Sequence, residues 1–314
     1  MSRPATSRDE VGFFARAGEE DIFGILTRPT IEPNGKAVIM CQGGAWIPSP
    51  GRNRFFVRLA RQFARHGYHA VRFDYHGVGD SSGEIGPLRL DSPFSDDVMA
   101  MAKWVEEEHG ISDFVLMGTC FGSRTALAAA TRLEQVSGVA LFPVPVRDMA
   151  SREKVVSYPL SWYLRRALTR RALTRMLEGR FRRRYLKLLR RKSGFVAVNA
   201  RKRAKGEAHT VYQKVSPVFL GHLGQVIDRH VPLLLVFGRE DMFYEDFRRG
   251  SKGPLAQLLQ RAGDRLRLHL VDGHAHGLAQ LDLQDQVFEA LEAWLIELDR
   301  GVKTISTVVE PAAS

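Results

Sequence analysis

Cysteine is scarce in this chain of 314 residues, which has only two, and long hydrophobic runs are missing altogether. Two cysteines cannot form a disulfide framework in a chain of this size, which favours a reducing compartment. No apolar run approaches the roughly eighteen residues needed to cross a bilayer. The polar stretch Met1–Glu10 contains no apolar segment typical of a secretory signal. We therefore expect a cytoplasmic protein.

Positive charge is concentrated in one segment of the chain. The formal net charge is +11, yet residues 147–205 hold 20 Lys or Arg and three Asp or Glu, a local net charge of +17, and the other residues sum to −6. Such an asymmetry marks the segment as a separate unit with its own role or partner. Because the sequence contains no nucleic-acid recognition motif, we expect no nucleic acid as that partner.

Outside this segment, short apolar runs alternate with amphipathic or alanine-rich stretches. The apolar runs predict strands at residues 11–16, 22–28, 36–41, 68–73, 113–117, 136–142, 231–237 and 266–271. The other stretches predict helices at residues 54–65, 98–108, 124–133, 255–261 and 284–298. This alternation favours an α/β fold with a mostly parallel, eight-stranded sheet that has helices on both faces. We expect the core to comprise residues 1–142 and 216–300, with a basic helical cap at 143–215 and a disordered tail at 301–314.

One strand-to-helix turn has the composition of a catalytic turn. The strand at 113–117 continues through a Gly-x-Cys-x-Gly motif, centred on Cys120, directly into a helix of small residues. A turn this tight requires residues without bulk two positions before and after its centre, and Gly118 and Gly122 stand there. The N-terminus of the following helix favours a thiolate and a developing oxyanion. A small buried cysteine in a structural turn is the alternative interpretation of this motif alone.

Three further segments support a catalytic interpretation. One follows the strand at 68–73 and contains Asp74, Gly77, Gly79, Ser81 and Gly83. The strand at 231–237 ends in a turn with Asp241, next to which stands Glu240 as an alternative acid. The strand at 266–271 ends in a loop with two histidines, His274 and His276.

Taken together, these segments resemble the α/β-hydrolase superfamily, with cysteine at the nucleophile position of its elbow motif. The resemblance covers the body of the chain without the cap, and it implies a catalytic triad of Cys120, Asp241 and His276, in the order typical of this fold. His276 stands three residues after Gly273, where the family usually has its base, which leaves His274 at the rim of the pocket.

The resemblance also implies an oxyanion hole made of backbone N–H groups. The N–H of Phe121 is one expected donor, and the turn at Gly43-Gly44 supplies the other, for which Gly44 is our candidate. That turn, the segment Arg52-Asn53-Arg54 and the cysteine elbow are similar to hydrolases encoded beside bacterial exosortase systems. Dienelactone hydrolases, which also have a cysteine elbow, are more distantly similar. The resemblance implies neither a cofactor nor a metal ion.

A cysteine nucleophile limits the substrates that we expect. Because a thiolate is also a good leaving group, its tetrahedral adduct with an amide or alkyl ester expels the thiolate and reverts to substrate. The adduct with a thioester or activated ester expels the leaving group of the substrate instead, and the acyl-cysteine forms. We therefore predict hydrolysis of acyl thioesters or activated esters through an acyl-cysteine intermediate. The alternatives are an acyltransferase or cyclase that passes the acyl group to an alcohol or amine, and a non-catalytic scaffold that binds a carrier protein or a membrane.

Apolar residues recur every four positions in the basic segment, at Leu173, Leu177, Phe181, Tyr185 and Leu189. This spacing predicts a helix that packs one face on the body as a lid, with arginines on its other faces. A solvated charged face is one explanation of these arginines. The other is an acidic partner: an acyl carrier protein, the phosphates of coenzyme A or an anionic membrane surface.

The second cysteine, Cys41, ends the strand expected beside the elbow strand. We predict a structural role for it, and a redox pair with Cys120 is the alternative.

Overall fold

The computed structural model describes residues 9–44, 48–148, 215–276, 278 and 280–300. These residues belong to one compact unit, which the chain leaves after Asp148 and re-enters at Val215. The predicted cap lies almost entirely outside the described residues, and so does the predicted tail. Each helix in the described part is too short or too polar to span a membrane.

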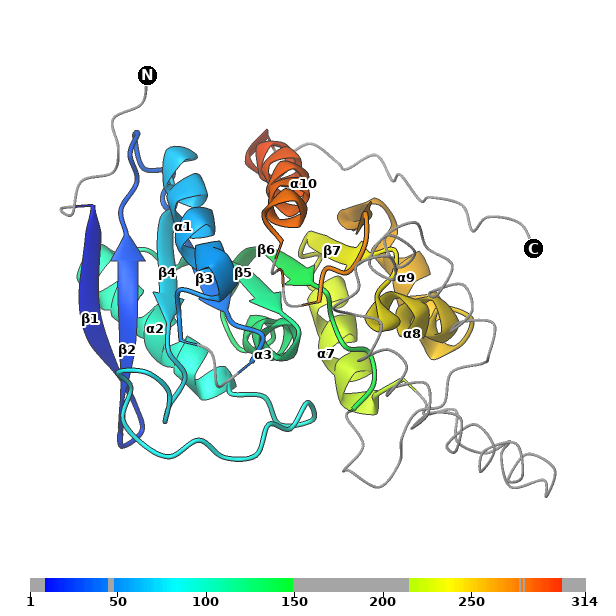
Figure 1. Cartoon of the computed structure of the whole chain (residues 1–314), viewed down its shortest axis with the longest axis horizontal. Coiled ribbons are helices and arrows are strands. Elements are labelled where there is room, and N and C mark those ends of the chain that lie inside the picture. Colours follow the sequence, from blue (N-terminus) through cyan, green and yellow to red (C-terminus); the bar gives the residue numbers. More distant parts are fainter. Residues whose placement is uncertain (1–8, 45–47, 149–214, 277, 279, 301–314) are drawn as a thin grey trace, which may run out of the picture. The chain divides into compact units, whose positions relative to one another are not determined.

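Eight strands form one sheet in the order β1-β2-β4-β3-β5-β6-β7-β8 (Figure 1). They are β1 Glu10–Ala17, β2 Glu20–Thr27, β3 Lys36–Cys41, β4 His69–Phe73, β5 Asp113–Thr119, β6 Gln135–Phe142, β7 Leu233–Gly238 and β8 Leu266–Val271. β2 pairs antiparallel with β1 and with β4. All the other pairs are parallel. The predicted mostly parallel, eight-stranded sheet is therefore confirmed.

The sheet is covered on both faces because its central strands are apolar on both sides. Alternate residues of β3 illustrate this: Ile39 packs into one core cluster and Met40 into the other. Helices α2 Ser95–His109, α3 Phe121–Ala130, α7 Pro217–Asp228, α8 Met242–Gly250 and α9 Pro254–Ala262 contribute to the first cluster. Helices α1 Phe55–Arg65 and α10 Leu281–Arg300 contribute to the second and lie side by side in Figure 1.

Two helices were not predicted from the sequence, and among the helix boundaries that differ from the prediction, one bears on the site. Helices α7 and α8 were not predicted, although Ser216 and Pro217 are typical of a helix start and the Ser216 side chain accepts a hydrogen bond from the Phe219 N–H. Helix α3 begins at Phe121 rather than Arg124. The helix thus starts immediately after Cys120, with no connecting residue.

A buried arginine joins the two points at which the chain leaves and re-enters the core. Arg124 of α3 has no exposed surface. It donates hydrogen bonds to the Pro145 carbonyl at 3.2 Å and to the Ser216 hydroxyl at 3.1 Å, and it forms an ion pair with Asp148 at 3.1 Å. The Ser216 N–H also donates to the Val146 carbonyl at 2.9 Å. Both junctions of the inserted segment are therefore held against the helix that follows Cys120.

Candidate active site

Cys120 lies in a strained backbone conformation between β5 and α3. Its φ of 50° and ψ of −114° are unfavourable for any residue with a side chain. The surrounding structure holds it there, because its N–H donates to the carbonyls of Phe142 and Pro143, each at 3.1 Å. Strained residues of this kind concentrate at functional sites.

Close packing around the turn accounts for its two glycines. A Cβ atom on Gly118 would overlap the carbonyl oxygen of Gly122, and a Cβ on Gly122 would overlap the carbonyl oxygen of Cys41. β3 and the start of α3 therefore approach each other at a distance that leaves no room for a side chain. This approach brings the end of β3 and the turn after it next to Cys120.

Asp241 follows β7 and is almost fully buried, at 3% exposure. Its Oδ2 accepts hydrogen bonds from the N–H groups of Gly238 and Ala275, both at 3.0 Å, and its Oδ1 accepts one from the N–H of His276 at 3.3 Å. The carboxylate thus fixes the backbone of the loop that carries both histidines.

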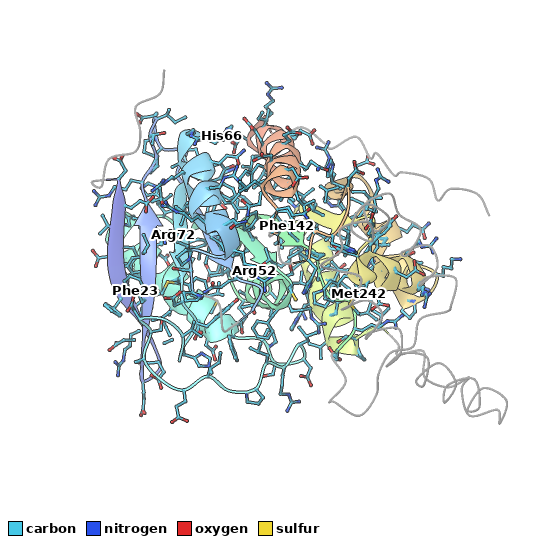
Figure 2. All side chains as sticks on the ribbon, in the orientation of Figure 1. Phe23, Arg52, His66, Arg72, Phe142 and Met242 are labelled. Atoms are coloured by element: carbon cyan, nitrogen blue, oxygen red, sulfur yellow. The ribbon has the colours of Figure 1, made fainter. Side chains whose placement is uncertain are left out.

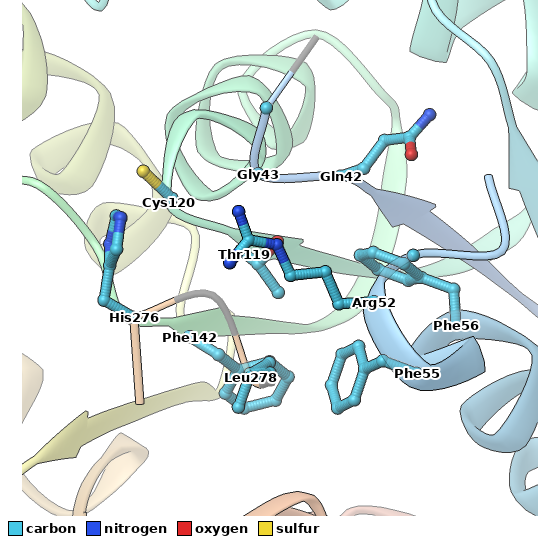
Figure 3. A pocket seen from close by; sticks show the side chains of 12 residues that line it. Gln42, Gly43, Arg52, Phe55, Phe56, Thr119, Cys120, Phe142, His276 and Leu278 are labelled. Atoms are coloured by element: carbon cyan, nitrogen blue, oxygen red, sulfur yellow. The ribbon is translucent and has the colours of Figure 1, made fainter. Parts of the chain in front are cut away.

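The two histidines differ in their surroundings. His276 lies beside Cys120 (Figure 3), with its ring 4.9 Å from that of Phe243. In the described part of the chain, no hydrogen bond joins the His276 ring to Cys120 or to Asp241. His274 places its Nδ1 3.5 Å from Oδ1 of Asp241 and its Nε2 3.4 Å from Glu240. The structure therefore brings Cys120 and His276 to one site and links Asp241 to His276 through the backbone. The ring hydrogen bonds expected of a triad remain a prediction.

Cys120 and His276 open into a pocket of about 240 Å³. Its lining consists of Gln42, Gly43, Gly44, Gly51, Arg52, Phe55, Phe56, Thr119, Cys120, Phe142, His276 and Leu278. Figure 2 labels two residues of this set, Phe142 at the end of β6 and Arg52 in the turn before α1. Most of the lining is apolar or glycine, and its ionisable side chains are those of Arg52, Cys120 and His276.

The site favours a neutral thiol and a neutral imidazole. The pKa of Cys120 is raised to about 11, mainly by burial; the Phe121 N–H opposes the shift, and the negative charge of Asp241 adds to it. Burial likewise lowers the pKa of His276, Asp241 opposes this shift, and Arg52 and His274 add to it. The thiolate expected from the helix N-terminus is thus disfavoured by desolvation, and the thiol needs a base that removes its proton.

The two predicted oxyanion donors lie next to each other, but one of them already has an acceptor. The Phe121 N–H donates to the Gly43 carbonyl at 3.3 Å. Gly44 lines the same pocket. Gly43 has no room for a side chain, because a Cβ would lie 2.6 Å from Oγ1 of Thr119. Stabilisation of an oxyanion by both donors therefore requires a rotation of the Gly43-Gly44 peptide, which two glycines permit.

Sequence reasoning did not assign Arg52, Phe55 and Phe56 to the pocket. Arg52 was singled out as part of a motif, without a location. Their position in the sequence could have placed them there. The segment follows the turn after a central parallel strand, and ligands bind at the carboxyl ends of such strands.

A family model described as "Serine aminopeptidase, S33" matches residues 36–282, most of the chain. The chain belongs to this family. Membership places it among the α/β-hydrolase enzymes, and the sheet order described above agrees with that fold.

Solved structures of α/β hydrolases have the same fold as this chain. A proline iminopeptidase from Mycobacterium smegmatis is 17% identical, with a TM-score of 0.56 over 93% of this chain and 99% of its own. A carboxyl esterase from Bacillus coagulans is 16% identical, with a TM-score of 0.56 over 92% and 98%. The esterase Pf2001 from Pyrococcus furiosus is 14% identical, with a TM-score of 0.55 over 94% and 98%. At these identities, the likeness establishes the fold alone.

An uncharacterized 31.7 kDa protein of Escherichia coli, encoded in the traX-finO intergenic region, is 30% identical over 101 residues. The match covers 32% of this chain and 34% of that protein. It thus spans about a third of the curated relative, and a second match to a protein of the same description is of the same extent.

The buried carboxylate leads to a prediction about stability. Replacing Asp241 with alanine leaves the N–H groups of Gly238, Ala275 and His276 without their acceptor, which we expect to lower the free energy of unfolding by about 3 kcal/mol. Asp241→Asn keeps an acceptor oxygen and should lose less. Urea denaturation measures the free energy of unfolding of both variants.

The control is Asp272→Ala, in the loop that carries the two histidines. The ion pair of Asp272 with Arg239 is exposed, so we expect its loss to lower the free energy of unfolding by less than about 0.5 kcal/mol. Equal costs for the two alanine variants would contradict this role of Asp241.

Proposed function

We propose that the protein hydrolyses acyl thioesters and activated esters through an acyl-cysteine intermediate on Cys120. The observation that carries this proposal is the strained turn that presents Cys120 to a largely apolar pocket beside a histidine. His276 acts as the base, and Asp241 orients it by holding the backbone of the loop that carries His276. The esterases among the structural neighbours are compatible with ester-type chemistry.

The first half-reaction transfers the acyl group to sulfur. Neutral His276 accepts the Sγ–H proton of Cys120 while the sulfur adds to the carbonyl carbon of the substrate. The lowered pKa of His276 keeps this base unprotonated at neutral pH, and the raised pKa of Cys120 makes a base necessary. The tetrahedral adduct then expels the leaving thiolate or phenolate, which takes the proton from His276.

The second half-reaction returns the enzyme to its starting state. A water molecule gives a proton to His276 and adds to the carbonyl carbon of the acyl-cysteine. The adduct releases the carboxylic acid, and the Cys120 sulfur regains its proton from His276. In both half-reactions the oxyanion lies next to the Phe121 N–H, after the Gly43 carbonyl has turned away from it.

The cysteine determines which substrates pass through the first half-reaction. From a tetrahedral adduct, the better leaving group departs first, and a thiolate leaves more readily than an alkoxide or an amine. Adducts with alkyl esters and amides therefore revert to substrate. Although the family is described as a serine aminopeptidase, the cysteine at position 120 argues against peptide hydrolysis by this member.

Substrates with matched acyl groups test this preference. We expect kcat/KM for a butyryl thioester or a 4-nitrophenyl butyrate to exceed that for ethyl butyrate or butyramide by at least about a hundredfold, because leaving-group ability decides the direction of collapse. Chromatography with and without an added alcohol or amine then identifies the product. Butyric acid as the product in both cases supports hydrolysis, and a butyryl ester or amide of the acceptor supports acyl transfer. Amide hydrolysis at a rate close to that of the thioester would contradict the proposal.

A further inference from the structure

Arg52 stands in a strained turn at the edge of the pocket. It follows Gly51, whose φ is 67°, and precedes Asn53 and Arg54, whose φ values are 48° and 57°. Two consecutive non-glycine residues in the left-handed region are unfavourable, so other contacts must hold this turn in place. The turn therefore presents the Arg52 side chain at a cost in backbone energy.

Gln284 of α10 supplies part of that support. It is fully buried, and its Nε2 donates to the carbonyl of Arg52 at 3.2 Å and to the carbonyl of Leu278 at 2.8 Å. Its Oε1 accepts a hydrogen bond from Arg58 at 2.6 Å. One buried amide thus joins the turn of Arg52 to the loop that follows His276 and fixes one wall of the pocket against the other.

The guanidinium of Arg52 reaches into the pocket. Figure 3 shows it directed toward the side of the pocket that holds Cys120 and His276. Within the described part of the chain, no carboxylate pairs with it, whereas Arg58 pairs with Asp285 at 2.5 Å and Arg61 with Glu10 at 2.8 Å. It is close enough to His276 for its charge to lower the pKa of that residue. A cation that faces the reacting groups without an acidic partner is suited to bind an anion of the substrate.

We propose that Arg52 is a specificity-determining residue that binds a carboxylate carried by the acyl group, next to the carbonyl attacked by Cys120. The inference rests on the proposed function and narrows its substrates to half-thioesters or half-esters of dicarboxylic acids. A guanidinium binds a carboxylate through two parallel hydrogen bonds, which also orients it. A pocket of about 240 Å³ holds a small acyl group, so the anion belongs to the reacting part of the substrate.

Alkylation of Cys120 tests the inference without any turnover. Iodoacetate and iodoacetamide have nearly the same size and both alkylate sulfur, but only iodoacetate carries a carboxylate. We expect Arg52→Met to lower the ratio of the iodoacetate rate to the iodoacetamide rate by about tenfold. Arg54→Met is the matched control, because Arg54 belongs to the same turn but does not line the pocket, and its ratio should equal that of the wild type. An unchanged ratio in Arg52→Met would overturn the inference.

A second test of the inference compares the turnover of a charged substrate with that of a neutral one. We expect Arg52→Met to lower the ratio of kcat/KM for the 4-nitrophenyl half-ester of succinic acid to kcat/KM for 4-nitrophenyl butyrate by at least about tenfold, because any effect on His276 is shared by both substrates and cancels in the ratio. Arg52→Lys retains the charge but not the geometry for two parallel hydrogen bonds, so its ratio should lie between those of the wild type and Arg52→Met. It also provides the comparison if Arg52→Met does not fold. Equal losses for both substrates would overturn the inference. If neither ester is hydrolysed while the alkylation ratio still falls, the proposed function fails and anion binding by Arg52 stands.

Discussion

Replacing Cys120 with alanine is expected to reduce kcat/KM for an acyl thioester by at least about 10³-fold. The variant loses the atom that attacks the carbonyl, and removal of a catalytic nucleophile has effects of this size or larger. Steady-state release of the thiol measures the loss. Urea denaturation of the same protein should show little change in stability, because the backbone of the turn is held by hydrogen bonds from Cys120 N–H to Phe142 and Pro143.

The second cysteine provides the matched control. Cys41 is fully buried, and burial raises the pKa of its thiol far above the usual range. Both cysteines are free thiols, and Cys41 pairs with Gly118 across the sheet. Cys41→Ala is therefore expected to retain most of the activity at some cost in stability. Full activity in Cys120→Ala would remove Cys120 from the mechanism, and a comparable loss in a folded Cys41→Ala would contradict the structural role of Cys41.

Replacing His276 with alanine is expected to lower turnover by about 10³-fold, whereas His274→Ala is expected to retain activity within about tenfold. The comparison is needed because Asp241 contacts the ring of His274 and only the backbone of His276. We assign the base to His276 because it lines the pocket with Cys120. A large loss in His274→Ala with an active His276→Ala would reverse the assignment.

The pH dependence of the wild type provides a further measure of the same residue. Only neutral His276 accepts the proton of Cys120, so activity is present above the pKa of this histidine and is lost as the pH falls through it. Since burial lowers that pKa from its usual value near 6.5, the acidic limb of kcat/KM should lie below pH 6.5.

Much of the fold could be predicted because its central strands are apolar on both faces. β3 has the predicted bounds because it is a compact apolar run that ends in a turn, and β8 has them because its leucines alternate with Arg267 and His269 as in a half-buried strand. Helix α8 was missed because it begins at Met242, directly after Asp241, which the prediction treated as part of a turn. Local pattern thus identifies well-bounded elements, whereas a helix that starts inside an apparent turn depends on tertiary packing.

Part of the candidate site could be predicted from the sequence, and part of it could not. Cys120, Asp241 and His276 could be identified from motifs. The tight turn at Cys120 requires glycines at fixed positions, and Asp241 and His276 each follow a predicted strand of the same sheet. The Gly43 carbonyl on the Phe121 N–H could not be predicted, because the orientation of one peptide depends on packing between β3 and α3. The position of Arg52 depends on a buried glutamine more than 200 residues further along the chain. The predictions for the basic cap and its acidic partner concern residues outside the described part and stay predictions.

Mass spectrometry of the enzyme during turnover detects the proposed acyl-cysteine intermediate directly. The protein is mixed with a butyryl thioester and quenched with acid within milliseconds, and the intact mass and the peptide that contains Cys120 are then measured. We expect a single added butyryl group on Cys120, which is sensitive to hydroxylamine and missing in Cys120→Ala. A butyryl group on another residue, or steady turnover by an enzyme whose Cys120 has been alkylated, would contradict the proposed mechanism.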